Sequence, residues 1–445
     1  MNFHESSSIF KNKFSFWIVF ILILVFRLAI DFGYEDFVVA IFDYDGFKYK
    51  FDSVRYITSL FLIFISYYLW SRKIGSILAY TYFVIYIVAL IPASSYYAIG
   101  EANPYSFFFN ILAYCILILF LPSSSSKSDF NIKRNLSNIN VGTNFIIFCW
   151  FFLSVCILGL YFNNHGKFVL SFDDVYEFRE DNQLTGILSY LFSWSVKVIA
   201  PFLLAYALIK KGFWSWNVVL SILIIILLFT LTGHKSVLVP IGFCLSLYYI
   251  FGGSKASGSY ITYDKIYMGF TIAMLSFVSL VYVYYIIYDN LMIPSIFLRR
   301  AMFTPPFLNS IYFDMFSEYP RVYWSNSILS PFITYPYFDT LTHEVGAYLG
   351  RYGMGANTGF VGSGYAHAGY LGILFYIGIM VFCNWFVAFF GKNVSPVLFN
   401  SVILMPYLTL FLSSDLPTTF FTHGIIISSL IIMSISGKLR IKPNN

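Results

Sequence analysis

The chain has 445 residues, of which 59% are hydrophobic and only 11% are charged, and its formal net charge is +6. A soluble domain carries about a quarter charged residues, so the composition excludes that class. Apolar runs of about 20 residues recur along the chain, whereas the alternating ten-residue segments of a membrane β-barrel do not. The five cysteines lie in apolar runs without a Cys-x-x-Cys pair, so we expect neither disulfides nor a zinc site. The sequence predicts an all-α, polytopic integral membrane protein.

Twelve apolar segments in chain order predict about twelve transmembrane helices in a single transmembrane domain, residues 1–445. We expect the first segment to be retained, because an acidic stretch and not a small-residue cleavage site follows it. That stretch, Asp31 to Asp52, is expected to be a polar loop. The predicted spans are Phe14–Ile30, Val54–Trp70, Ile74–Ile99, Tyr105–Pro122, Asn144–Phe162, Ile187–Ile209, Trp214–Thr232, Ser236–Phe251, Ile266–Tyr288, Ala366–Gly391, Ser395–Leu412 and Phe420–Ser436.

The basic residues between the spans indicate the orientation, because cytoplasmic segments are enriched in lysine and arginine. With both termini in the cytoplasm, only the acids Glu5, Asp129 and Asp264 face inward. The interval Asp289–Gly362 then forms one large extracytoplasmic loop. The inward-facing basic residues are Lys11, Lys13, Arg72, Lys73, Lys127, Lys133, Arg134, Lys210, Lys211, Lys255, Lys265, Lys392, Lys438, Arg440 and Lys442.

Charged residues inside apolar spans are costly and are candidates for function. Arg27 lies near the predicted outer end of its span, so we expect its side chain to snorkel to the interface. Lys197 lies nearer the middle of a helix, where functional and structural roles are both open. Lys235 follows Gly233-His234 at the mouth of a helical hairpin, where it could hold an anion or solvate the turn.

The large loop is dense in glycine, which indicates tight turns or close backbone approach. Its arginines Arg299, Arg300 and Arg351 carry forked donors that match phosphate oxygens. Binding of lipid headgroups without chemistry is the alternative for them. The aromatic stretch Ser310–Phe316 predicts an amphipathic helix at the membrane interface. The loop could also be a simple linker between two helices.

Three residues near Arg351 could act as a general base on a hydroxyl: His343, Glu344 and His367. We rank His343 first, because a helix would place it on the same face as Arg351. His367 is expected to begin the tenth span, where a helix N-terminus disfavours a protonated ring. A role for His343 in capping or local hydrogen bonding is equally open. No His-x-x-x-His pair, carboxylate cluster or Walker loop is present, so no metal or nucleotide site is expected.

Three stretches of the chain resemble the O-antigen polymerases, also called Wzy-type oligosaccharide repeat-unit polymerases. Thr232-Gly233-His234-Lys235-Ser236 is similar to the family's small-Gly-x-basic hairpin, with histidine-lysine where arginine is frequent. Arg351 and Gly362 fit an Arg-x10-Gly pattern of the large loop. The other matching residues are Arg300, Pro305, Tyr312, Phe316-Ser317-Glu318-Tyr319-Pro320 and the segment Asn357 to Gly372.

The resemblance implies a metal-independent glycosyltransferase of the bacterial inner membrane that needs no cofactor. Such an enzyme transfers a growing glycan en bloc from undecaprenyl pyrophosphate onto the next lipid-linked repeat unit. Implied partners are the undecaprenyl-pyrophosphate-linked oligosaccharide, membrane lipids and a chain-length regulator protein, but no nucleic acid. The implied residues for binding pyrophosphate or glycan are Arg299, Arg300, Arg351, Lys235, Asn357 and Tyr312.

Two other functions fit the same pattern. A flippase for lipid-linked oligosaccharides also has about twelve helices, but it would place its charged site near the middle of the bilayer. An O-antigen ligase performs similar chemistry with lipid A as the acceptor, and the sequence separates it poorly from a polymerase.

Overall fold

The computed structural model describes residues 13–122, 141–171, 174–251, 263–392 and 394–436. Within these ranges the chain is helical, and its only β-type pairing is one isolated bridge between Tyr49 and Gly100. The chain divides into two compact units, which we describe separately. Unit 1 comprises Met1–Ser123, Thr262–Asn384 and Leu410–Leu416, and unit 2 comprises Ser124–Ile261, Trp385–Thr409 and Pro417–Asn445.

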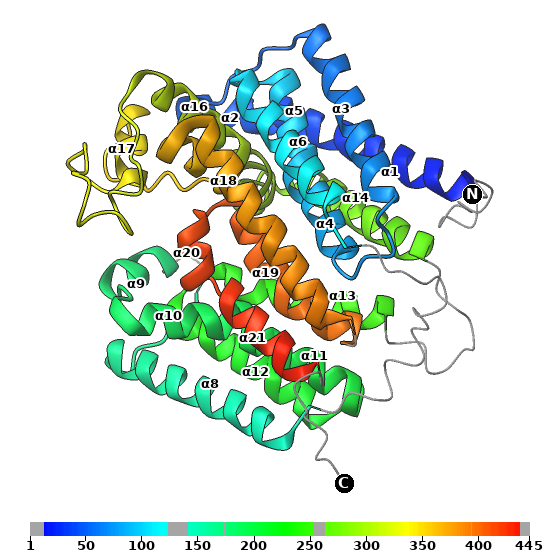
Figure 1. The fold of residues 1–445 in the computed structure, drawn as a ribbon, viewed down its shortest axis with the longest axis vertical. Helices are drawn as coiled ribbons and strands as arrows, with labels where there is room; N and C mark the ends of the chain where they lie inside the picture. The colour runs from blue at the N-terminus through cyan, green and yellow to red at the C-terminus, as the bar shows by residue number, and fades with distance from the viewer. Residues whose placement is uncertain (1–12, 123–140, 172–173, 252–262, 393, 437–445) are drawn as a thin grey trace. The chain divides into compact units, whose positions relative to one another are not determined.

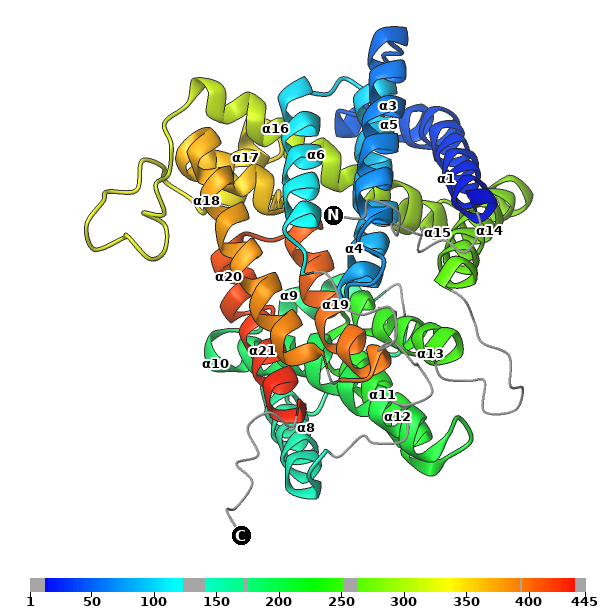
Figure 2. The ribbon, with the colours of Figure 1, turned by 45° about the vertical axis from the view of Figure 1, so that its right-hand side comes forward.

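The first part of unit 1 is a group of apolar helices joined by short turns. Asp52 begins α3 by accepting hydrogen bonds from the backbone N–H groups of Val54 (2.8 Å) and Arg55 (3.0 Å). Asn103 begins α6 in the same way, with Pro104 in the first turn. In Figures 1 and 2, α3, α5 and α6 lie side by side. The elements are α1 (Lys13–Gly33), η1 (Tyr34–Val39), α2 (Ala40–Phe42), η2 (Asp43–Asp45), α3 (Ser53–Ser71), α4 (Ala79–Ile85), η3 (Tyr86–Leu90), α5 (Ile91–Ile99) and α6 (Pro104–Leu119).

The predicted polar loop after the first span is wrong over most of its length, because the chain stays helical through α1, η1, α2 and η2 to Asp45. The apolar residues of this stretch recur at helical spacing between the acids. Tyr34, Phe37, Val38 and Phe42 are all buried, so one helical face packs inward, while Glu35, Asp36 and Asp43 are exposed.

Arg27 also differs from its prediction, since its side chain is 1% exposed and does not snorkel. The continued helix places Asp31 one turn after Arg27, with Arg27 Nε 3.7 Å from Asp31 Oδ2. Arg27 Nη2 donates to the carbonyl of Ser94 at 3.3 Å, and Asp31 accepts from Ser95 and Tyr56. The carboxylate of Asp31 therefore compensates the charge of Arg27, in place of the expected contact with water.

The second part of unit 1 holds most of the predicted large loop, and much of that loop is helical. α16 packs against α5 and α6. We expected Ser310–Phe316 to lie at the membrane interface, but residues around nearly the whole circumference of α16 are buried, so it is a core helix. The elements are α14 (Tyr263–Tyr288), α15 (Met292–Pro294), η6 (Ser295–Phe303), α16 (Thr304–Glu318), α17 (Leu341–Tyr348) and α18 (Phe360–Gly391), which continues into unit 2.

Unit 2 packs α11 against α12 and α13. Gly233 ends α12 in a left-handed conformation with φ 65°, which forms the tight hairpin expected there. The elements are α8 (Thr143–Asn163), α9 (Val175–Asp181), α10 (Gly186–Trp194), η4 (Ser195–Ile199), α11 (Ala200–Lys211), α12 (Trp216–Thr232), η5 (Lys235–Leu238), α13 (Val239–Phe251), α19 (Pro396–Leu412), α20 (Leu416–Phe421) and α21 (Ile425–Ile435), of which α19 and α20 begin or end in unit 1.

Eight helices in the described ranges are long and apolar enough to cross a membrane, which confirms a helical membrane protein. Four shorter apolar helices of 10–17 residues occupy the other predicted spans. The count of twelve stays a prediction, and so does the orientation. Several basic residues behind the orientation lie outside the described residues, namely Lys11, Lys127, Lys133, Arg134, Lys255, Lys438, Arg440 and Lys442.

Candidate functional site

Two of the predicted phosphate-binding arginines meet at one carboxylate in unit 1. Asp45 pairs through Oδ2 with Arg299 Nη1 and through Oδ1 with Arg351 Nη2. The Asp45 side chain is 8% exposed, that of Arg299 16% and that of Arg351 28%. Two guanidinium forks therefore converge on a bridging anion, which is the geometry that binds phosphate oxygens.

Neighbouring groups hold both arginines in place. Arg299 Nε donates to Ser295 Oγ at 3.1 Å, and its guanidinium carbon lies 4.1 Å from the ring centroid of Phe42. Arg351 Nη2 also donates to the carbonyl of Tyr44 at 3.0 Å. Each fork is thus fixed on at least two sides, so little side-chain entropy remains to be lost when an anion binds.

Arg300, the other predicted partner of Arg351, is exposed and follows Arg299 directly on the π-helix η6. The ion pairs recorded for Asp45 are those with Arg299 and Arg351. A role of Arg300 in binding pyrophosphate stays a prediction.

The turn that carries Arg351 folds back onto α17. Arg351 N donates to the carbonyl of Gly346 at 2.8 Å, and Ala356 N donates to the carbonyl of Thr342 at 2.9 Å. A Cβ atom at Gly346 would overlap the backbone carbonyl of Met354, so only glycine allows this approach. The glycine density of the loop thus marks close backbone packing, as expected.

His343 lies on α17 with part of its ring in solvent. Its side chain is 39% exposed, and its Nδ1 lies 3.3 Å from Asp339 Oδ1. When Nδ1–H donates to Asp339, Nε2 carries the lone pair and can accept a proton. The prediction that His343 and Arg351 share a helical face is wrong, however, because α17 ends at Tyr348 and Arg351 lies in the following turn.

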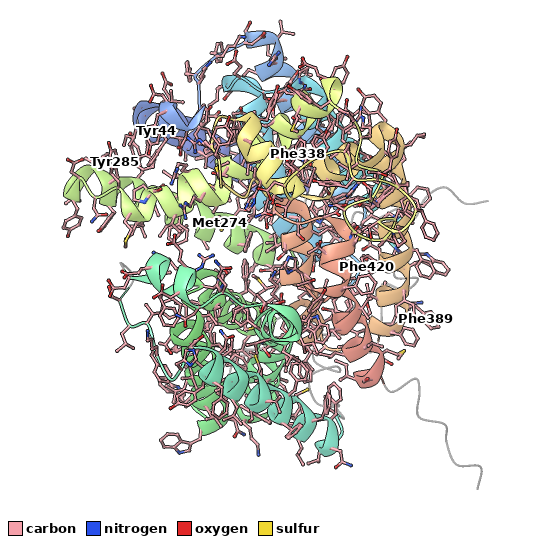
Figure 3. The ribbon with its side chains drawn as sticks, turned by 90° about the vertical axis from the view of Figure 1, so that its left-hand side faces the viewer. Tyr44, Met274, Tyr285, Phe338, Phe389 and Phe420 are labelled. Atoms are coloured by element: carbon pink, nitrogen blue, oxygen red, sulfur yellow. The ribbon has the colours of Figure 1, made fainter. Side chains whose placement is uncertain are left out.

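Glu344 has a structural role at the start of α17, and its predicted catalytic role stays a prediction. Its Oε1 accepts hydrogen bonds from the backbone N–H groups of Phe338 (3.1 Å) and Asp339 (2.7 Å). It thereby fixes the start of α17 and the residue that contacts His343. Figure 3 labels Phe338 on the exposed segment that leads into this helix.

In this arrangement, both ring nitrogens of His367, the third predicted base, have hydrogen-bond partners. Nδ1 accepts from the backbone N–H of Trp324 at 3.1 Å, so Nε2 carries the proton and donates to Asp415 Oδ2 at 3.1 Å. The ring is 0% exposed and stacks on the indole of Trp324. α18 begins at Phe360, seven residues earlier, so His367 does not lie at its N-terminus.

Asp415 completes this buried group. Burial raises the pKa of its carboxyl, but hydrogen bonds from His367, Tyr376 and Ser363 outweigh burial and hold the pKa below its usual range. Its Oδ1 also accepts from Leu416 N at 2.8 Å, at the start of α20. We interpret the His367–Asp415 pair as a structural contact that holds α18 to the residue before α20.

The His367–Asp415 contact lies where α18 leaves the helical conformation. Ala368 and Gly369 leave the helical conformation, and Gly369 has φ 61°. The carbonyl groups released there are taken up by a segment of the predicted large loop: Arg321 Nη1 donates to Tyr365 O at 2.6 Å, Val322 N to Ala366 O at 3.0 Å and Tyr323 N to His367 O at 3.0 Å. The loop is thereby fastened to a membrane-spanning helix.

The two predicted glycan-binding residues differ in exposure. Tyr312 is 1% exposed, and its hydroxyl donates to the carbonyl of Ala356 at 2.9 Å, so it supports the loop from beneath and cannot reach a sugar. Asn357, which follows Ala356 in the chain, is exposed. Asn357 therefore presents an amide to solvent beside the segment that Tyr312 fixes.

The predicted anion-binding Lys235 belongs to unit 2, whereas Arg299 and Arg351 belong to unit 1. It is half-buried in the hairpin after Gly233. Lys197, also in unit 2, lies with its Nζ 2.7 Å from His423 Nδ1.

Sequence reasoning missed three residues that organise this site: Asp45, Asp339 and Asp415. Asp45 lies about 250 residues before Arg299, so spacing along the chain gave no signal for the pairing. Asp339 lies four residues before His343, one helical turn away, and that spacing could have identified it.

No protein-family model, no curated protein and no solved structure matches this chain.

Proposed function

We propose that this chain polymerises lipid-linked oligosaccharide repeat units at the outer face of a bacterial inner membrane. In this proposal the donor is a glycan on undecaprenyl pyrophosphate, and the acceptor is a sugar hydroxyl of the next lipid-linked unit. The orientation that the basic residues predict puts α17 and the arginine pair on the outer side.

The convergence of Arg299 and Arg351 on Asp45 carries the proposal. A leaving pyrophosphate gains negative charge as its bond to the sugar breaks, and two prepositioned guanidinium groups stabilise that charge. Both arginines come from segments that a simple linker would not need to bring together.

His343 is the proposed base. The acceptor oxygen attacks the anomeric carbon, the bond from that carbon to the pyrophosphate oxygen breaks, and the pyrophosphate leaves with the electron pair. The proton of the attacking hydroxyl passes to Nε2 of His343, while Asp339 orients the ring through Nδ1. The exposed amide of Asn357 is the proposed contact for the sugar.

The test is deletion of the gene in its natural host, followed by a gel of the surface polysaccharide. We expect the ladder of chain lengths to collapse to a single-repeat band and to return when the wild-type chain is supplied. Complete loss of surface glycan would contradict a polymerase and would favour a ligase or a flippase. Protein with Arg351→Ala, present in the membrane at wild-type level, is expected not to restore the ladder.

A further inference from the structure

Unit 2 holds a half-buried lysine, Lys197, that has no acidic partner among the described residues. Lys197 lies in the π-helical turn η4, within an apolar stretch that is long enough to cross a membrane. Its recorded hydrogen bond joins Nζ to Nδ1 of His423 at 2.7 Å. A ring nitrogen that accepts from an ammonium group carries no proton, so His423 is neutral in this contact and supplies no negative charge.

The contact leaves the ammonium group incompletely satisfied. Lysine has three N–H donors, and a second group, Ser193 Oγ at 3.2 Å, competes for the same lone pair of His423. A buried ammonium without a counter-charge is costly, and in a membrane segment such a residue marks a binding site by default. No contact recorded among the described residues supplies Lys197 with a negative charge.

His234, at the tip of the hairpin, lies within the electrostatic reach of Lys197. Its ring is tilted against that of Phe192, one turn before η4, at 5.5 Å between centroids. Burial, and then the positive charges of Arg179 and Lys197, lower the pKa of His234 to about 4. Lys197 and Arg179 thus both act on one ring, from η4 and from α9.

The elements that form this group are packed tightly in unit 2. A Cβ atom at Gly233 would lie 3.4 Å from Cγ of Arg179, so α9 covers the hairpin directly. The acids of α9 do not neutralise the interior, since Glu177, Glu180 and Asp181 are exposed. Arg179 is exposed on the same helix as these acids, and none of the three acids is recorded as a partner of Lys197.

We propose that Lys197, with His423 beside it, binds the phosphate group of an amphiphilic lipid. The surrounding helices are apolar, so a free ion would have to lose its hydration completely to reach Lys197. An amphiphile brings its phosphate along the helix surface while its tail stays in the bilayer. The inference uses unit 2 alone and does not rest on the proposed function, whose residues all lie in unit 1.

The experiment measures lipid binding to the purified full-length protein by native mass spectrometry from detergent micelles. Dioleoyl phosphatidic acid is the probe, dioleoylglycerol is the same lipid without phosphate, and inorganic phosphate is the anion without a tail. The variants are Lys197→Met, Lys197→Gln and Lys197→Arg. Lys167→Met is the matched control, because it removes one exposed lysine from the segment after α8 of the same unit.

We expect Lys197→Met and Lys197→Gln to weaken phosphatidic acid binding at least about ten-fold, as for a lost charge-assisted hydrogen bond. Lys197→Arg and Lys167→Met should stay within a few-fold of wild type. Equal affinity of wild type and both neutral variants would overturn the site. The site would also be overturned if the wild-type protein bound dioleoylglycerol as tightly as phosphatidic acid, a result that needs no variant. If inorganic phosphate bound as tightly as phosphatidic acid, the assignment to a lipid would be overturned.

Discussion

Unit 1 holds three of its arginines against carboxylates, whereas unit 2 holds the half-buried Lys197 beside a neutral histidine. In unit 1, Arg27 lies against Asp31, and Arg299 and Arg351 share Asp45. Such pairs hold their side chains in fixed positions, but an incoming anion must compete with the acid already present. The lysine of unit 2 has no competitor in the described chain, so it gains more from an external anion and is held less firmly without one.

The largest effect should come from the base, because removing it stops proton transfer and not only binding. His343→Ala is expected to slow transfer roughly a hundred- to ten-thousand-fold in an assay with purified protein and a synthetic lipid-linked repeat unit. Asp339→Asn keeps His343 but loses the charge that orients it, so a smaller loss is expected. If both variants turn over within a few-fold of wild type, the acceptor is activated elsewhere.

Breaking the arginine pair should have the next largest effect. Arg299→Ala and Arg351→Ala are each expected to lower kcat/KM for the lipid-linked donor about 10- to 150-fold, the range for a hydrogen bond to a charged group. Arg351→Lys keeps the charge but loses the fork, so it should remain impaired.

Arg300→Ala is the matched control for the arginine pair, since Arg300 adjoins Arg299 and is exposed. Near wild-type activity is expected from it. An Arg300→Ala loss as large as that of Arg299→Ala would show that charge in the region matters and the geometry at Asp45 does not.

Asp45→Asn sharpens the comparison by making unit 1 resemble unit 2. Its guanidinium partners lose their internal anion, so the melting temperature should fall while the KM for the donor decreases. A higher KM together with the lower melting temperature would show that Asp45 only positions the arginines and does not compete with substrate.

The smallest effect concerns His234 of unit 2, whose pKa is lowered to about 4. The unfolded chain takes up the proton near pH 6.5, before the folded chain does. Folding stability is therefore expected to fall as the pH drops from about 6.5 towards 4. His234→Asn should flatten this part of the melting temperature profile, and an unchanged profile would exclude His234 as its cause.

Sequence patterns were sufficient for the eight long apolar helices and for some of the site. Apolar runs located the spans because burial in lipid requires them, and forked donors singled out Arg299 and Arg351 as residues for an anion. Their partner Asp45 could not be predicted, because in the sequence it is one of several acids in a predicted polar loop. Only the buried face of Tyr34, Phe37 and Phe42 shows that this stretch is helical and turns inward.

The role of His367 also depended on packing that the sequence does not encode locally. Its neighbours Trp324 and Asp415 lie 43 and 48 residues away along the chain, on either side of it. Without them a histidine near a predicted helix start looks accessible, and with them it is enclosed.

The break in α18 has a consequence for how the chain is made. A straight helix of its 32 residues would be about 48 Å long, against about 30 Å for the hydrocarbon of a bilayer. The stretch after Gly369 is long enough to insert alone, and the short turns before the break depend on partners from 321–324, which are synthesised earlier. Insertion of the long half and docking of the short half can therefore be separate events during biosynthesis, with the second completed only once residues 321–324 are in place.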